Sequence, residues 1–274
     1  MIFLNIFSAI ASLAIFVFLL YVLLFVRPRA RKAKSASLLS DYAHRGLHDG
    51  NKGDTPENSL LAFEKACRAG YGIELDVQLS RDGVVMVFHD YTLIRMTGKD
   101  GKVCEYDAAE LKELSLANTE QKIPTFTEVL ALVDGRVSLL IELKGEDFDS
   151  SLCPKVAEIL KDYKGEYCIE SFNPLLVRNM RRLMPDVFYG QLYTNVVRDK
   201  KKASALNIIL TCMAFNFLAR PDFIAYNIED RRSLPVWLST KLYKAERFIW
   251  TARSREEYDK AHALSEHPIF ENLE

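Results

Sequence analysis

Residues 72–90, GIELDVQLSRDGVVMVFHD, predict a strand, a tight turn and a returning strand. Glu74 and Asp76 are two positions apart, so on a strand both side chains point to one face while their apolar neighbours point to the other. The Asp-Gly pair between the two apolar runs is typical of a two-residue hairpin. Such a turn would place residue 89 opposite residue 76, so we expect His89 to lie beside Asp76.

On both sides of this stretch, short apolar runs alternate with helical patterns. We expect eight strands besides the returning one, at 42–44, 73–77, 137–143, 167–171, 187–193, 223–228, 248–251 and 269–272. Thr55 as N-cap with Pro56 predicts the start of the first intervening helix. Residues 91–124 are irregular and indicate a small insertion after the second strand. The pattern predicts an α/β fold, a (β/α)8 TIM-type barrel, with a doubly wound open sheet as the alternative.

Composition excludes several classes of protein. The 274 residues are 49% hydrophobic, enough for one large domain or two small ones. The net charge is -1, and there is no long basic stripe with interleaved aromatics, so no nucleic-acid partner is expected. The five cysteines are scattered without a C-x-x-C pair, which argues against a zinc knuckle or a disulfide framework and favours a reducing compartment. The sequence does not indicate a protein partner or an oligomeric state.

The N-terminus predicts a membrane segment. Residues 2–26 are almost continuously apolar, longer than the ~30 Å hydrocarbon core requires. A cleaved signal peptide is the alternative, but no Lys or Arg precedes the run, whereas five follow at 27–34. We expect a single-pass anchor (1–26), a basic juxtamembrane linker (27–40) and a barrel domain (41–274). The basic cluster places the barrel domain in the cytoplasm.

Three carboxylates are expected to meet at the barrel mouth, where the carboxyl ends of the strands supply the reacting groups. Glu74, Asp76 and Glu142 occupy such positions, and Lys144 shares the strand face of Glu142. Carboxylates ~4 Å apart repel by about 4 kcal/mol per pair at an effective dielectric of ~20. A divalent cation would remove that cost, and all-oxygen ligation favours Mg²⁺ or Ca²⁺ over Zn²⁺.

Two histidines and an arginine flank this cluster. His44 and His89 are the candidate acid and base, because imidazole titrates near neutral pH, and the pattern does not assign which is which. Arg45 is expected to hold phosphate oxygens with its planar guanidinium, and Lys144 to act as a point charge. These groups predict chemistry on a phosphodiester.

The motifs resemble those of a known family and come in its order. They are His44-Arg45-Gly46, Pro56-Glu57-Asn58-Ser59, Ile73-Glu74-Leu75-Asp76-Val77, Arg81-Asp82-Gly83, His89-Asp90, residues 93–98, residues 123–130, Ile141-Glu142-Leu143-Lys144, Ser171-Phe172 and Trp250-Thr251. Over residues 41–273 the chain resembles a glycerophosphodiester phosphodiesterase, of a membrane-anchored bacterial type. The resemblance implies a cation on Glu74, Asp76 and Glu142. It also implies attack by the substrate's own glycerol hydroxyl, with one histidine as base and the other protonating the departing alcohol, before water opens the cyclic phosphate.

Two further residues have two interpretations each. Glu57 is expected in a first helical turn from the helix dipole alone, whereas the resemblance puts it near the substrate. Trp250 is either a barrel core residue or a wall under the glycerol. The chain departs from the family at Trp250-Thr251-Ala252-Arg253 and at residues 269–272. Both departures lie where the alcohol would bind, so they leave the headgroup undetermined.

The expected function is metal-dependent hydrolysis of glycerophosphodiesters to sn-glycerol 3-phosphate and an alcohol. The alternatives are a lysophospholipase D acting on membrane lysophospholipids and a non-catalytic headgroup-binding module. Residues 204–218, SALNIILTCMAFNFL, bear on this choice, because an all-round apolar helix is either buried in the core or lies on a membrane. The second interpretation favours a lipid substrate.

Overall fold

The structure, a computed structural model, describes residues 2–145 and 150–273. The strands in this part of the chain are β1 (Tyr42–Ala43), β2 (Gly72–Leu79), β3 (Val85–Val87), β4 (Leu139–Leu143), β5 (Tyr167–Ser171), β6 (Phe188–Tyr193), β7 (Phe223–Asn227), β8 (Glu246–Ala252) and β9 (His267–Phe270). All except β3 run parallel and close into a barrel, because β1 pairs with both β2 and β9. The predicted (β/α)8 barrel is confirmed, and the open sheet is excluded.

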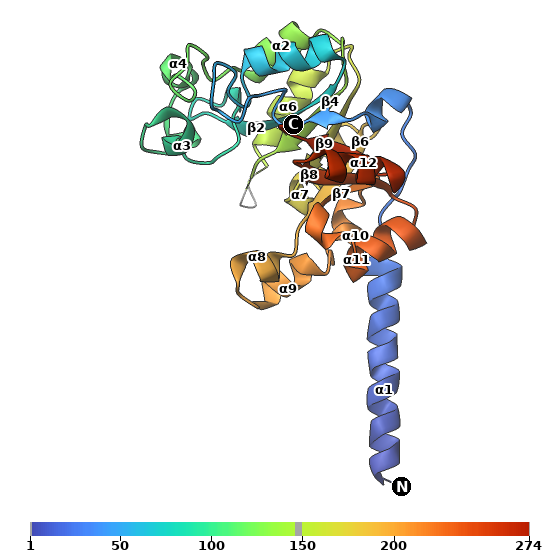
Figure 1. Cartoon of the computed structure of the whole chain (residues 1–274). Helices are drawn as coiled ribbons and strands as arrows, with labels where there is room; N and C mark the ends of the chain where they lie inside the picture. The colour runs from blue at the N-terminus through green and yellow to red at the C-terminus, as the bar shows by residue number, and fades with distance from the viewer. Residues whose placement is uncertain (1, 146–149, 274) are drawn as a thin grey trace.

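Helices surround this barrel, and α1 extends away from it (Figure 1). The α-helices are α1 (Ile2–Leu20), α2 (Leu60–Ala69), α3 (Ile94–Thr97), α4 (Ala108–Glu113), α5 (Phe126–Val133), α6 (Leu152–Leu160), α7 (Pro174–Leu183), α8 (Val196–Lys200), α9 (Ala205–Thr211), α10 (Asn216–Ala219), α11 (Leu234–Trp237) and α12 (Arg255–Ala263). The tighter or wider helical turns are η1 (Tyr21–Phe25), η2 (Ala36–Leu39), η3 (Val103–Glu105), η4 (Ile228–Asp230) and η5 (Leu238–Leu242).

Two apolar layers hold the barrel together. Aromatic and aliphatic side chains fill its interior, among them Tyr42, Leu140, Phe223 and Phe248. Gly190 makes room for one of them, because a Cβ there would lie 2.1 Å from the Phe223 ring. A larger cluster packs the outer barrel surface against the helices. Full burial of each such side chain stabilises the folded state by about 1.5–3 kcal/mol. The two apolar layers therefore hold the ends of the strands in fixed positions.

The hairpin after β2 has a loop one residue longer than predicted. Val77 pairs with Val87, and the backbone N–H of Ser80 donates to the carbonyl oxygen of Val84 (3.0 Å). Three residues, 81–83, are therefore left in the turn, with Gly83 in the left-handed region at φ 78°. The backbone N–H of Phe88 donates to the carbonyl oxygen of Asp76 (3.0 Å). The predicted pairing of residues 76 and 89 was therefore wrong by one position.

The first helix after β1 also begins later than predicted. The backbone N–H of Ala62 donates to Ser59 Oγ (3.1 Å), so Ser59 is the N-cap and α2 begins at Leu60 rather than at Pro56. Asn58 adopts φ 54°, and its N–H donates to the carbonyl oxygen of Arg45. Residues 55–58 thus form a loop that turns back toward the barrel mouth instead of the first helical turn.

Residues 204–218 do not form one helix. Helix α9 ends at Thr211, Met213 has φ 51°, and the short helix α10 follows. Only Asn207 of α9 is buried. The core-helix interpretation is therefore wrong for α9.

The apolar N-terminal segment is continuous with the domain. Residues Asn5–Phe25 form a helix long and apolar enough to cross a membrane, a test that signal sequences also pass. Val26, directly after it, is fully buried, and its carbonyl oxygen accepts from Asn216 Nδ2 (2.9 Å). The following basic residues lie along the barrel; Arg31, for example, donates to the carbonyl oxygen of Val187 and lies 3.6 Å from Asp222.

Candidate active site

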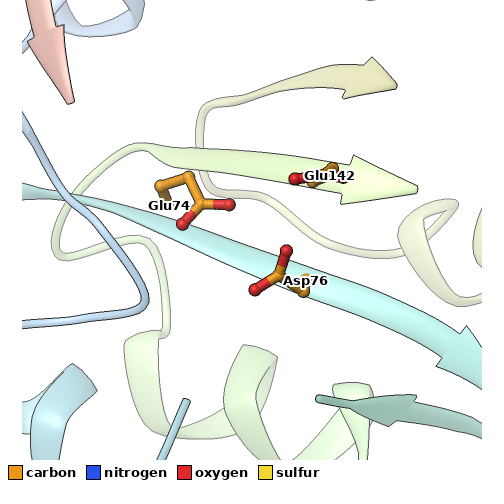
Figure 2. A group of neighbouring side chains, drawn as sticks. All are labelled: Glu74, Asp76 and Glu142. Carbon is orange, nitrogen blue, oxygen red and sulfur yellow. The ribbon is translucent and has the colours of Figure 1, made fainter. Parts of the chain in front are cut away.

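Three carboxylates meet at the carboxyl ends of β2 and β4. Oxygen atoms of Glu74, Asp76 and Glu142 lie within 4.8 Å of one another, and all three residues are buried. The register explains the meeting, because Asp76 pairs with Glu142 on the neighbouring strand and Glu74 shares the face of Asp76. Figure 2 shows the three side chains pointing toward one another. The predicted cluster is present.

The environment of these carboxylates suits a hard divalent cation. Burial, and then the charges of Asp76 and Glu142, raise the pKa of Glu74 well above its ordinary value. Burial likewise raises the pKa of Glu142. Several buried acids at one point are costly unless a cation neutralises them, and all the candidate ligand atoms are oxygen. The cluster could therefore hold Mg²⁺ or Ca²⁺.

Lys144 supplies positive charge at the same point. Its Nζ lies 2.9 Å from Asp76 Oδ1 and 2.7 Å from Glu142 Oε1. Burial would lower the pKa of Lys144, but the two carboxylates raise it, so the ammonium stays charged. Burial would raise the pKa of Asp76, but Lys144, His89 and Arg45 hold it well below its ordinary value.

Arg45 approaches the cluster from the loop after β1. Its backbone N–H donates to Glu74 Oε2 (2.9 Å), an orientation reached in the left-handed region at φ 56°. Its guanidinium donates to Glu57 (2.7 Å) and lies 3.7 Å from Asp76. Gly46 allows the loop to pack closely, since a Cβ there would lie 2.9 Å from Ala62.

Glu57 belongs to the site. Its carboxylate accepts from Arg45, Asn51 and Arg95. Burial would raise the pKa of Glu57, but Arg95 and Arg45 lower it to about 2. Because Glu57 is not in a helix, the dipole interpretation does not apply, and the residue instead fixes the two arginines.

His44 is held by a residue from the other end of the chain. Its Nδ1 lies 2.7 Å from Glu271 Oε2, and Arg253 donates to the other oxygen of that carboxylate (2.5 Å). Burial lowers the pKa of His44 to about 4, although the Glu271 hydrogen bond opposes this shift. The contact leaves Nε2 as the ring nitrogen available to a substrate.

His89 is held in the same way by the residue that follows it. Its Nδ1 lies 2.6 Å from Asp90 Oδ1, and Arg95 donates to Asp90 Oδ2 (2.5 Å). The residue before His89, Phe88, donates its backbone N–H to the carbonyl oxygen of Asp76, and His89 lines the same cleft as Glu142. The predicted proximity of His89 to Asp76 is therefore present despite the shifted hairpin register.

A cleft of about 490 Å³ opens beside these groups. Its lining includes His89, Glu142, Lys144 and Phe172. Phe172 meets Trp250 edge-on, with ring centroids 5.6 Å apart, and Trp250 Nε1 donates to the carbonyl oxygen of Ala225. Trp250 is half-buried and packs against the barrel core, as the first of its two interpretations predicts. Phe172 thus places an aromatic ring in the lining of the cleft, and Trp250 packs against it.

The sequence analysis did not predict a role at the site for three polar residues, Asn58, Glu170 and Glu271. Asn58 Nδ2 donates to Asp76 Oδ2 (2.9 Å). Glu170 on β5 is paired in register with Glu142 and is buried. Glu271 holds His44, as described above. An acidic residue inside an apolar strand pattern could have indicated Glu170, whereas no local signal connects Glu271 with a histidine 227 positions away.

Comparisons with known proteins identify a family. The family profile described as "Glycerophosphoryl diester phosphodiesterase family" matches residues 44–271. A glycerophosphodiester phosphodiesterase of Bacillus altitudinis is 36% identical over 58% of this chain and 68% of its own length. One from Caldanaerobacter subterraneus is 34% identical over 53% of this chain. The match to the latter spans 65% of its length, slightly under two thirds.

Solved structures share the fold. The glycerophosphodiester phosphodiesterase of Thermotoga maritima is 28% identical with a TM-score of 0.62, covering 84% of this chain and 92% of its own. An Oleispira antarctica phosphodiesterase, solved with the product sn-glycerol-3-phosphate, has a TM-score of 0.67 at 23% identity, covering 85% and 92%. The chain therefore belongs to the glycerophosphoryl diester phosphodiesterase family, a family of phosphoric diester hydrolases.

Proposed function

We propose that this protein hydrolyses glycerophosphodiesters to sn-glycerol 3-phosphate and an alcohol, with the help of a divalent cation. The observation that carries the proposal is the buried cluster of Glu74, Asp76 and Glu142 between two carboxylate-held histidines. With Arg45, Lys144 and a divalent cation, the cluster would have a net charge of +1, which a singly charged phosphodiester neutralises. Bound there, Mg²⁺ or Ca²⁺ would polarise a phosphoryl oxygen and offset the developing negative charge.

The residues of the chain divide the remaining work. The Arg45 guanidinium would hold the phosphate, kept in place by Glu57, and Lys144 would add positive charge beside it. One histidine would take the proton of the glycerol hydroxyl that attacks phosphorus. The other would protonate the alkoxide oxygen as the phosphorus–alcohol bond breaks, and water would then open the cyclic ester. The aromatic wall of Phe172 and Trp250 would exclude water from the leaving alcohol.

The membrane attachment is part of the same proposal. The span Asn5–Phe25 would anchor the chain, and the cations at 27–34 would keep the barrel domain on the cytoplasmic side. Burial of Val26 supports an uncleaved anchor. Cleavage that removed the chain up to and including Val26 would leave a gap in the apolar layer between the barrel and the helices.

Product analysis tests the enzymatic proposal. The full chain in detergent would be given glycerophosphocholine, glycerophosphoethanolamine and a lysophospholipid, each with Mg²⁺, with Ca²⁺ and with EDTA. We expect sn-glycerol 3-phosphate and the free alcohol in the presence of a cation. Undiminished hydrolysis in EDTA would contradict the cation dependence, and turnover of none of the three substrates would favour a headgroup-binding module.

A second candidate, lysophospholipase D activity, is favoured by one observation. The segment that follows β6 at the carboxyl ends of the strands carries the exposed apolar side chains of α9, so an acyl chain would find an apolar surface at the end of the barrel that holds the site. Faster release of alcohol from the lysophospholipid than from the two water-soluble diesters would select this activity.

A further inference from the structure

Large apolar side chains are exposed on both sides of the point where α1 joins the domain. On α9, Leu206 and Ile208 are 56% and 48% exposed, and on α11, Leu234 and Trp237 are 51% and 53% exposed. Scattered exposed apolar residues are normal, but several on neighbouring elements mark an interaction surface. We call the set the exit surface; it consists of Leu206, Ile208, Ile209, Phe217, Leu234, Trp237 and Leu242.

The exit surface is continuous with the end of the apolar helix. Phe25 meets Phe217 edge-on with ring centroids 5.4 Å apart. On the other side, Tyr243 Oη donates to the carbonyl oxygen of Val22 (2.6 Å). The last turn before Val26 therefore lies between α10 and Tyr243, the residue that follows η5, in contact with both.

The length of the apolar helix sets the level of this surface relative to a bilayer. Residues Asn5–Phe25, at ~1.5 Å per residue, match a hydrocarbon core of ~30 Å. When they cross it, Phe25 lies at the boundary between hydrocarbon and headgroups, and Phe217 lies beside it. Figure 1 shows α9, α10 and α11 close to the level at which the N-terminal helix leaves the domain.

Basic residues surround the apolar ones. Lys200, Lys201 and Lys202 are exposed directly before α9, and Lys241 and Lys244 are exposed in and after η5. None of the five has an ion-pair partner closer than 4 Å within residues 2–145 and 150–273. A tryptophan beside apolar side chains with a lysine rim suits the headgroup region of an anionic bilayer.

We infer that the exit surface lies on an anionic phospholipid bilayer, with Trp237 and α9 at the level of the headgroups. The inference rests on the membrane anchor proposed above. The domain is therefore attached to the membrane at three places, namely the anchor, α9 and α11, rather than by the anchor alone.

The two tryptophans of the chain allow a direct test. The full chain would be reconstituted in vesicles of phosphatidylglycerol and phosphatidylcholine, with the latter brominated near the headgroup end of one acyl chain. In Trp250→Phe only Trp237 emits, and its fluorescence should fall by roughly half against unbrominated vesicles. In Trp237→Phe only Trp250 emits, inside the barrel mouth, and should be unchanged. If Trp250→Phe does not fold, the difference between wild type and Trp237→Phe gives the Trp237 signal.

A matched pair of single-tryptophan chains reports on α9. With both native tryptophans replaced by phenylalanine, Ile208→Trp should be quenched, and Ile94→Trp should not. Ile94 is also about half exposed, at 51%, but lies on α3 in the insertion, far from the N-terminal helix (Figure 1).

The outcomes separate this inference from the proposals it rests on. Release of the chain by an alkaline carbonate wash would contradict both the anchor and the docking. A carbonate-resistant chain with unquenched Trp237 would overturn the docking alone. Unquenched Trp237 whose emission shifts with protein concentration would assign the surface to a second copy of the chain. Hydrolysis in detergent, measured separately, tests the enzymatic proposal.

Discussion

The two sides of the barrel mouth are built differently. On the β1–β5 side, which we call the charged side, inward positions carry Glu74, Asp76, Glu142 and Glu170, all buried. On the β6–β8 side, the apolar side, inward positions carry residues such as Leu192 and Ala225, with Trp250 packed on them. Buried carboxylates raise the free energy of the folded state, whereas buried apolar groups lower it. We therefore expect the charged side to serve binding and chemistry, and the apolar side and its helices to maintain the fold.

Because the charged side carries the proposed chemistry, the largest loss of activity is expected from substitutions in the carboxylate cluster. Glu74→Gln, Asp76→Asn and Glu142→Gln should each lower kcat by ~10³-fold or more, because each would remove a charge that the proposed cation site needs. Their melting temperatures should not fall by more than a few degrees. Calorimetric titration with Mg²⁺ and Ca²⁺ would measure the loss of binding. Unfolded variants would show that the charged side also maintains the fold.

The histidines come next. His44→Ala and His89→Ala should each reduce kcat by ~10²-fold while cation affinity changes little, because in the proposed mechanism the rings move protons and do not hold the cation. The pH–rate profile of the wild type should be bell-shaped, and each variant should lose one limb. A variant with near-normal kcat would remove that histidine from the mechanism.

Glu271→Gln should have a smaller effect, about tenfold on kcat with little change in KM, because it weakens the contact that orients His44. The ring would still be present, so the variant should retain far more activity than His44→Ala. Glu256→Gln, at an exposed position of α12, is the matched control. Equal activity of Glu271→Gln and Glu256→Gln would show that this contact has no catalytic role.

Glu170→Gln should alter stability rather than turnover. Burial, and then the charges of Glu142 and Asp76, raise the pKa of Glu170 well above its ordinary value. The folded state therefore favours the protonated form of Glu170. The stability that this form contributes is complete below the ordinary pKa of about 4.5 and is lost as the pH rises through the pKa of Glu170 in the folded state. Above that window the Gln variant should be the more stable, by about 1 kcal/mol or more. If the melting temperatures of the wild type and of Glu170→Gln changed in parallel between pH 4 and 8, this prediction would be contradicted.

The smallest effect is expected on the apolar side. Asn216→Ala removes the closer of two side-chain donors to the buried carbonyl oxygen of Val26, the other being Ser239 Oγ at 3.4 Å. It should lower the free energy of unfolding by about 1 kcal/mol, with kcat unchanged in detergent. Chemical denaturation and a hydrolysis assay on one preparation would measure both. A loss of kcat without a loss of stability would show that the contact between Asn216 and Val26 affects the active site.

Patterns among residues that are close in the sequence were sufficient to predict most of the fold. The alternation of apolar runs and helix caps predicted the eight barrel strands, and the spacing of Glu74 and Asp76 predicted their common face. Both features depend on periodicity alone. The hairpin register was missed because one additional loop residue, with Gly83 in the left-handed region, shifts every pairing by one.

Features that depend on distant contacts could not be predicted from the sequence. Thr55 and Pro56 are typical of a helix start, but Glu57 is held by Arg45 and Arg95 and the chain forms a turn there instead of a helix. Residues 204–218 have the composition of one helix, yet the segment breaks where it meets Tyr21, which donates to the carbonyl oxygen of Cys212. In both places tertiary contacts override the local preference.

The burial of Val26 also determines how the enzyme would search for its substrate. A catalytic domain on a flexible tether sweeps a volume whose radius grows with the length of the linker. Here the basic residues after Val26 lie along the barrel, so an anchored chain would keep its mouth within a thin layer at one height above the lipid. Diffusion within the membrane plane, rather than swinging of the domain, would then bring the mouth to substrates confined to the same leaflet.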